Sequence, residues 1–142
     1  MAEVTNKIIR GTFGALWMDN EQLANVKSFE CKASMHYETV QVSGELCDQQ
    51  RYTGYDLSGT VVLHKINTQM ASKVASGMKT GSMPSIKFVT RLADPDSVGA
   101  ERVAIYDVTF DEVTLTAFTN GNIGEESVPF KAGGYEYLDV IE

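Results

Sequence analysis

One helix-like pattern in a chain of otherwise strand-like alternation constrains this fold more than any other feature. It lies within residues 55–81, which begin as an apolar-rich extended run and end as a helix. Asn67 suits the N-cap, because its side chain can accept hydrogen bonds from the first free backbone N–H groups. Gly81 suits the C′ position. Over residues 68–80 the pattern predicts an amphipathic helix that packs on a face of a β structure through Met70, Ala71, Val74, Ala75 and Met78.

Strand-like segments fill most of the remaining chain. Residues 29–37 alternate apolar with polar side chains, which predicts a strand with one buried and one solvated face. An extension of this strand to residue 42 fits the pattern. Other strands are expected at residues 12–18, 22–26, 57–66, 86–92, 101–110, 113–117, 125–131 and 135–141. The sum predicts a mainly β (α+β) fold, an antiparallel β-sandwich or barrel with one packed α-helix.

The length is that of one domain, residues 1–142. Residues 1–11 are polar and lack a period, so we expect a flexible arm. Residues 43–55 are also aperiodic and polar, and they are too long for a tight turn. Because their flanks are strand-like, we expect them to be the projecting loop of a long hairpin.

Charge and apolar content exclude several classes of function. The net charge of −7 opposes sequence-independent binding to nucleic acids, which neutralises phosphates with Lys and Arg. No run approaches the roughly 18 apolar residues of a membrane span, and residues 1–10 contain no apolar core of signal-peptide length. We therefore expect a cytosolic product with Cys31 and Cys47 as free thiols, and a disulfide between them is the less favoured alternative.

Two segments and one group of separate residues resemble chemical motifs but lack their essential parts. Residues 94–99 suggest a calcium loop, but the third ligand position is a valine and no glutamate occupies the twelfth. Residues 77–80 suggest a phosphate loop, but they end a helix instead of opening one. His36, His64 and Glu30 could share a polar face, yet no metal-ligand spacing connects them. We expect no catalytic residue, no metal and no cofactor, so the chain is not expected to be an enzyme.

Several segments together resemble one family. They are Asp94-Pro95-Asp96-Ser97-x-Gly99-Ala100-Glu101-Arg102, Phe110-Asp111-Glu112-Val113-Thr114-Leu115, Gly11-Thr12-Phe13-Gly14-Ala15-Leu16-Trp17, Tyr52-x-Gly54-Tyr55 and Tyr135-Glu136-Tyr137-Leu138-Asp139. In matching order and over nearly the whole chain, they resemble tail tube proteins of contractile-tailed phages and phage-tail-like bacteriocins, in the XkdM-like group. The match is collective, because no single motif is a chemical signature.

The resemblance implies an architectural virion protein that self-assembles. Such proteins form homohexameric rings whose strands join one β-barrel, and the stacked rings make a tube inside a contractile sheath. The implied partners are other copies of the chain, the tail sheath protein, the baseplate and the tape-measure protein. DNA would only pass through the channel, without specific binding. The implied location is the tail of a phage, prophage or bacteriocin particle assembled in the bacterial host cytoplasm.

Two sets of residues follow as candidate sites. The polar faces of the strands are expected to line the channel, where the net charge suggests an acidic lining that repels phosphate: Glu30, Lys32, Ser34, His36, Ser58, Thr60, Asp107, Thr109, Glu112, Thr114 and Thr116. The projecting loop is expected to make contacts between rings: Gly44, Glu45, Asp48, Gln49, Gln50, Arg51 and Tyr52. The alternative function is a monomeric β-sandwich ligand-binding module that uses the same polar face, although the pattern contains no aromatic-lined polar pocket.

Overall fold

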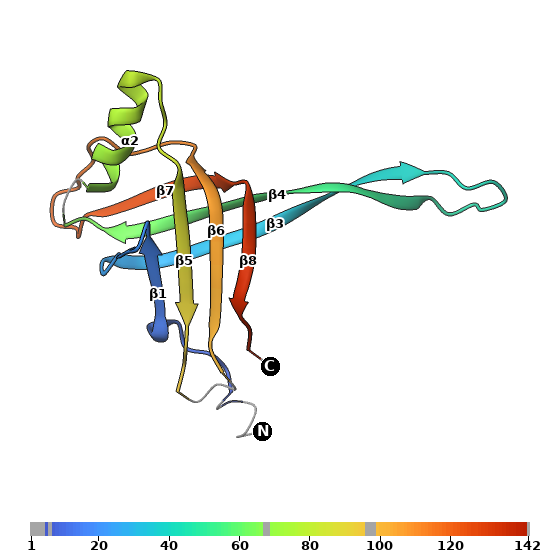
Figure 1. Cartoon of the computed structure of the whole chain (residues 1–142), viewed down its shortest axis with the longest axis horizontal. Coiled ribbons are helices and arrows are strands. Elements are labelled where there is room, and N and C mark those ends of the chain that lie inside the picture. Colours follow the sequence, from blue (N-terminus) through green and yellow to red (C-terminus); the bar gives the residue numbers. More distant parts are fainter. Residues whose placement is uncertain (1–4, 6, 67–68, 96–98, 142) are drawn as a thin grey trace.

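The computed structural model describes residues 5, 7–66, 69–95 and 99–141. Figure 1 shows two crossed layers of strands, one helix at their margin and a long hairpin that leaves the body. The elements are η1 (Gly11–Phe13), β1 (Gly14–Met18), β2 (Glu21–Gln22), β3 (Val26–Val40), β4 (Gln49–His64), α2 (Gln69–Thr80), β5 (Ile86–Leu92), β6 (Glu101–Phe110), β7 (Glu125–Ala132) and β8 (Gly134–Asp139).

The strands form one antiparallel sheet that folds over on itself. Its order is β2-β1-β5-β6-β7-β4-β3, and β8 also pairs with β6. The first part of β6 pairs with β5 and β8, whereas its last two residues, Thr109 and Phe110, pair with β7. Asp107 has a φ of +53°, and the β5–β6 register shifts opposite it, so this irregularity turns β6 from one layer to the other. The predicted antiparallel sandwich with one helix is confirmed.

The core lies between the two layers. From β4 and β7 it takes alternate residues, such as Val61 and Phe130, and from the facing layer it takes the fully buried Phe88. Phe29 of β3 stacks on Phe130 with ring centroids 5.7 Å apart and meets Phe88 edge-on at 5.6 Å. Burying each such side chain contributes about 1.5–3 kcal/mol. Gly59 is required beside this aromatic group, because a Cβ there would collide with the Glu30 carbonyl oxygen.

The helix α2 packs less extensively than its pattern predicts. Ala71 and Val74 are buried, but Met78 is half exposed. Figure 1 shows α2 at the margin of the body, near the first part of β7 and the start of β5. Its buried residues do not belong to the core cluster between the two layers, so α2 covers less of the sheet than expected. The proposed N-cap, Asn67, lies outside the described residues.

Three predictions of strand and loop positions need correction. Residues 22–26 do not form a strand of their own, because β2 ends at Gln22 and Val26 is the first residue of β3. Residues 113–117 form no strand. The expected loop over residues 43–55 is wrong in its second half, because β4 begins at Gln49 and pairs with Val40 of β3. The hairpin continues because backbone pairing needs no apolar period, so polar residues 49–54 can still form a ladder.

Within residues 1–11, which were expected to form a flexible arm, Arg10 is held in place by hydrogen bonds to Asp94. Its backbone N–H and its Nε each donate to Asp94 Oδ2 at 2.9 Å, and Nη2 donates to Oδ1 at 2.9 Å. The Asp94 side chain is almost fully buried. A buried carboxylate needs such partners, so this ion pair anchors the start of the chain to the loop after β5.

Candidate functional site: the two faces of the β3–β4 hairpin

The strands β3, β4 and β7 present one continuous polar face on the side away from the core. Glu30 lies opposite Thr60, and Lys32 lies opposite Ser58. Ser58 in turn lies opposite Lys131 of β7, which pairs with Thr109 of β6. Directly opposed residues in an antiparallel sheet point to the same side, so the structure brings these residues into cross-strand rows.

Most of the predicted channel-lining residues meet on this polar face. Seven of them lie on it, and the structure buries none of these within the chain: Glu30, Lys32, Ser34, His36, Ser58, Thr60 and Thr109. Asp107 lies at the corner of β6. Glu112, Thr114 and Thr116 lie in the segment after β6 that forms no strand.

Sequence reasoning missed part of the same polar face. Asp56 of β4 lies opposite Ser34, and Ser127 and Lys131 of β7 continue the rows beyond β4. The sequence contained the signal for β7, because Val128 and Phe130 are buried and alternate with the exposed Ser127 and Lys131. That alternation has the same period of two that identified β3.

The polar face carries exposed side chains of both charges. Two side-chain pairs lie along it: Lys32 with Glu30 at 3.4 Å and His36 Nε2 with Asp56 Oδ2 at 2.7 Å. At its end, Lys27 Nζ donates to Glu125 Oε1 at 2.7 Å, and this hydrogen bond lowers the pKa of the Glu125 carboxyl. Among the exposed residues of β3, β4 and β7, four are acidic and four are basic: Glu30, Glu38, Asp56 and Glu125, and Lys27, Lys32, Arg51 and Lys131.

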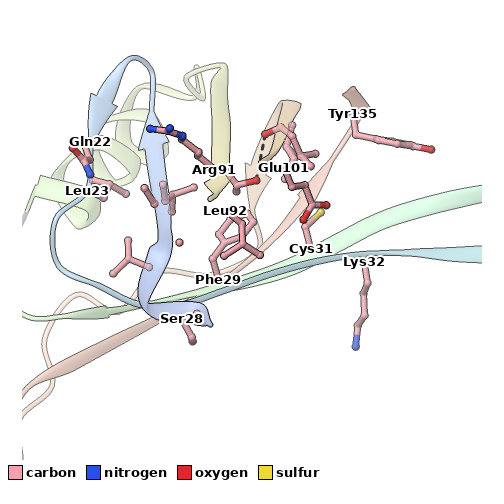
Figure 2. A pocket seen from close by; sticks show the side chains of 18 of the residues that line it. Gln22, Leu23, Ser28, Phe29, Cys31, Lys32, Arg91, Leu92, Glu101 and Tyr135 are labelled. Atoms are coloured by element: carbon pink, nitrogen blue, oxygen red, sulfur yellow. Dashed lines mark hydrogen bonds between the residues drawn. The ribbon is translucent and has the colours of Figure 1, made fainter. Parts of the chain in front are cut away.

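The opposite face of β3 is apolar and borders a groove. Figure 2 shows Phe29 and Cys31 pointing into this groove, while Ser28 and Lys32 point the other way. The groove has a volume of about 710 Å³ and lies between β3 and the layer that contains β1, β5, β6 and β8. Burial raises the pKa of the Cys31 thiol, and neither cysteine forms a disulfide. The strand β3 therefore has one polar and one apolar face, as its alternation predicts, and we call such a strand or hairpin two-faced.

Beyond the groove, the β3–β4 hairpin has no second layer to cover it. Residues 32–53 are all exposed, on both faces, because the hairpin leaves the body of the protein there (Figure 1). Its apolar face nevertheless carries paired aromatic rings, with Tyr37 and Tyr52 5.8 Å apart and Tyr55 and Tyr135 of β8 6.3 Å apart. An exposed apolar stripe of this kind marks a surface that another molecule covers.

The predicted inter-ring residues are divided between two structures in this hairpin. Gly44, Glu45 and Asp48 lie in the connecting loop, where Gly44 has a φ of +89°. Gln49, Gln50, Arg51 and Tyr52 lie in β4. All seven are exposed, and they occupy the tip of the hairpin, far from the core.

Several strand edges lack a strand partner in the described part of the chain, and those of β3 and β7 bound the polar face. The strand β3 pairs with β4 alone, so its outer edge carries free backbone donors and acceptors. The strand β7 pairs with β6 only at Phe130 and Lys131, which leaves the outer edge of residues 125–128 without a strand partner. Open edges invite pairing with another chain.

The described residues contain no cluster of three or more His, Cys, Asp or Glu side chains that could hold a metal ion. None of the helices described is long and apolar enough to cross a membrane.

The fold is that of a structural β protein, with open strand edges and a long hairpin that has one polar and one apolar face. A family model described as phage tail tube protein matches residues 3–139. The chain belongs to this family of phage tail tube proteins, which are structural and not enzymatic. The family resemblance inferred from the sequence is thereby confirmed.

Individual relatives agree with this family assignment. XkdM of the phage-like element PBSX and YqbM, both from Bacillus subtilis, are each 31% identical to this chain over 144 residues, covering 100% of it and 96% of each relative. A chain in the cryo-EM structure of the PVC sheath–tube complex, an extracellular contractile injection system, has a TM-score of 0.72 at 10% identity and covers 93% of this chain and 92% of that one. This structural likeness shows that the fold is shared.

Proposed function

We propose that the chain is the subunit of the inner tube of a contractile phage tail or tail-like particle, where rings of six copies stack around a channel. The observation that carries this proposal is the two-faced β3–β4 hairpin, whose polar face is solvated and whose outer edge is open. A ring that joins such sheets edge to edge removes the open edges and leaves the polar face toward one side.

In this proposal the polar face of β3, β4 and β7 lines the channel. Its acidic and basic side chains balance, and several are paired with each other. Such a lining neither collects phosphate groups as a basic surface would nor repels them strongly. A polyanion or a tape-measure protein can therefore pass without being held.

The distal hairpin supplies the contact between rings in this proposal. Its exposed apolar face, which carries Tyr37 and Tyr52, needs a covering surface. The hairpin tip extends well beyond the body of its own chain (Figure 1), so the next ring is the surface within its reach. Sheath and baseplate proteins complete the proposed set of partners in the tail, which is assembled in the host cytoplasm.

Negative-stain electron microscopy of the purified chain across a concentration series tests the proposal. Hollow tubes or stacked rings, formed alone or on added preassembled baseplate, are the expected result. Monomers under both conditions would refute the tube function and would favour a ligand-binding module.

Deletion of Gly44–Arg51 tests the role of the hairpin tip. The deletion leaves Tyr37 and Tyr52 as the last cross-strand pair, so the circular dichroism spectrum should be unchanged while tubes disappear. Replacement of the same residues by a Gly–Ser sequence of equal length is the matched control for hairpin length. Normal tubes from the deletion variant would contradict the inter-ring role.

A further inference from the structure

The segment between β6 and β7 combines features of a strand with an irregular conformation. Residues 111–124 form no strand, although Val113, Leu115 and Ala117 alternate with Glu112, Thr114 and Thr116. Leu115 is 62% exposed, Phe118 91% and Ile123 81%. These exposed apolar side chains follow directly after β6, at the open outer edge of β7.

The β6 end of the segment continues the β6–β7 ladder in one register. Thr109 pairs with Lys131 and Phe110 with Phe130. The Asp111 N–H then donates to the Pro129 carbonyl at 3.0 Å, which extends the same register by one residue. A regular continuation would place Glu112 opposite the buried Val128, which would direct an acidic side chain toward the core side.

The turn at the other end of the segment favours a different register. The Asn122 N–H donates to the Thr119 carbonyl at 3.1 Å, and Gly121 has a φ of +85°, whereas Asn120 does not have the positive φ of a type I′ turn in the free chain. Asn-Gly is nevertheless the dipeptide that most favours a two-residue type I′ hairpin. A hairpin closed in this way on assembly would place Val113 opposite Val128, so its register would differ by one residue from the register at the β6 end.

One extra residue at Glu112 reconciles the two registers as a β-bulge. Asp111 and Leu115 are bends in the structure, so the chain departs from the ladder directly after the Asp111 hydrogen bond. With the bulge, Val113 lies on the core side with the buried Val128, and Thr114 faces the polar side with Ser127. The alternation of the sequence and the two faces of β7 then agree.

Strand direction identifies the partner for the outer edge of this segment. Because β4 is antiparallel to both β3 and β7, the strands β3 and β7 run the same way. In a ring of identical copies, the β3 of one copy would meet the β7 of the next in parallel. A strand over residues 113–119 between them runs antiparallel to both, which gives the more stable pairing throughout.

From these registers we propose that residues 113–119 become a strand on assembly, paired on one edge with β7 of the same chain and on the other with β3 of a neighbouring copy. This inference rests on the proposed tube function and names the surface that joins subunits within a ring. In the free chain a strand over these residues would be hydrogen-bonded on one edge only, and pairing with a second copy would add the hydrogen bonds of the other edge.

Hydrogen-exchange mass spectrometry of free chain and assembled tubes tests the new strand. Amides of residues 113–119 should exchange at least about tenfold more slowly in tubes than in the free chain. Tubes in which this segment exchanges as fast as in the free chain would overturn the inference while leaving the tube function intact. Failure to form tubes, even with baseplate, would overturn the proposed function and this inference with it.

A proline substitution tests whether the backbone N–H of the segment is needed. Thr116 is exposed, so Thr116→Pro should leave the melting temperature of the free chain unchanged while abolishing tubes, because proline cannot donate to a ladder. The matched control, Thr116→Ala, keeps the N–H and should form tubes normally. Normal tubes from the proline variant would contradict the strand.

Disulfide cross-linking identifies the neighbouring strand. In a background whose two native cysteines are replaced, Thr114→Cys is combined with a cysteine at one polar-face position of β3, chosen from Glu30, Lys32 and Ser34. At least one combination should give a ladder of covalent oligomers from oxidised tubes. Ser58→Cys is the control, because β3 separates Ser58 from the neighbour and a disulfide needs Cβ atoms about 3.8 Å apart. Tubes that give no ladder at any β3 position would overturn the pairing.

Discussion

Gly59→Ala should destabilise the fold, because Gly59 of β4 lies directly opposite Cys31 of β3 and Phe130 of β7 and has no room for a Cβ. The new methyl group would collide with the Glu30 carbonyl oxygen and lie 2.7 Å from Phe130 Cζ and 2.9 Å from Cys31 Cα. Two of these three atoms belong to the backbone of β3, so no single side chain can rotate away to make room. Overpacking of this kind typically costs about 1–3 kcal/mol, and the rigid contacts place Gly59→Ala toward the upper end of that range.

Thermal unfolding followed by circular dichroism measures this effect. For a chain of this length, about 2–3 kcal/mol corresponds to a fall of roughly 6–9 °C in the melting temperature. Gly134→Ala is the matched control, because it is also a strand glycine but has open space around its Cβ position. The reasoning is refuted if Gly59→Ala melts at the same temperature as Gly134→Ala.

Three further predictions concern single side chains. Arg10→Ala should lower the free energy of unfolding by about 2 kcal/mol in urea titrations, because the buried Asp94 carboxylate loses two charge-assisted hydrogen bonds; an unchanged midpoint would contradict this. Maleimide should label the exposed Cys47 much faster than Cys31, whose thiol pKa is raised by burial, and equal rates would speak against this. The hydrogen bond from Lys27 keeps the pKa of the Glu125 carboxyl below the ordinary 4.5. The ionised carboxylate therefore stabilises the fold above pH 4.5, and this stabilisation is lost as the pH falls through the lowered pKa. Glu125→Gln should therefore weaken the acid-induced loss of stability, and an unchanged pH profile would count against it.

Much of the fold could be predicted because alternation has one physical cause. Side chains on a strand point to opposite faces in turn, so residues 29–37 revealed both faces of β3 before any partner strand was known. The polar face of β3 and β4 follows from the same rule, and most of the predicted channel-lining residues lie on it. The helix was also identifiable from its period, although not its position at the margin of the sheet.

The remaining features depend on contacts that a local pattern does not contain. Ile105 and Val108 both reach the core although a regular strand would direct them to opposite faces, because the irregular backbone at Asp107 shifts the alternation of β6. The Arg10–Asp94 pair joins residues far apart in sequence. The charge balance of the polar face required Lys131 of β7 to be placed beside β3 and β4.

The distal hairpin makes the unassembled chain vulnerable to proteases. From residue 32 to residue 53 it is a two-stranded ribbon without a core, and such ribbons are marginally stable in water. Its loop is an exposed tip of the kind at which proteolytic cleavage begins. A chain that fails to assemble is therefore cut first at the hairpin, and the cut removes the part that would otherwise reach the next copy. The length of the hairpin thus allows contact with a distant copy, and it also shortens the lifetime of any chain that does not make this contact.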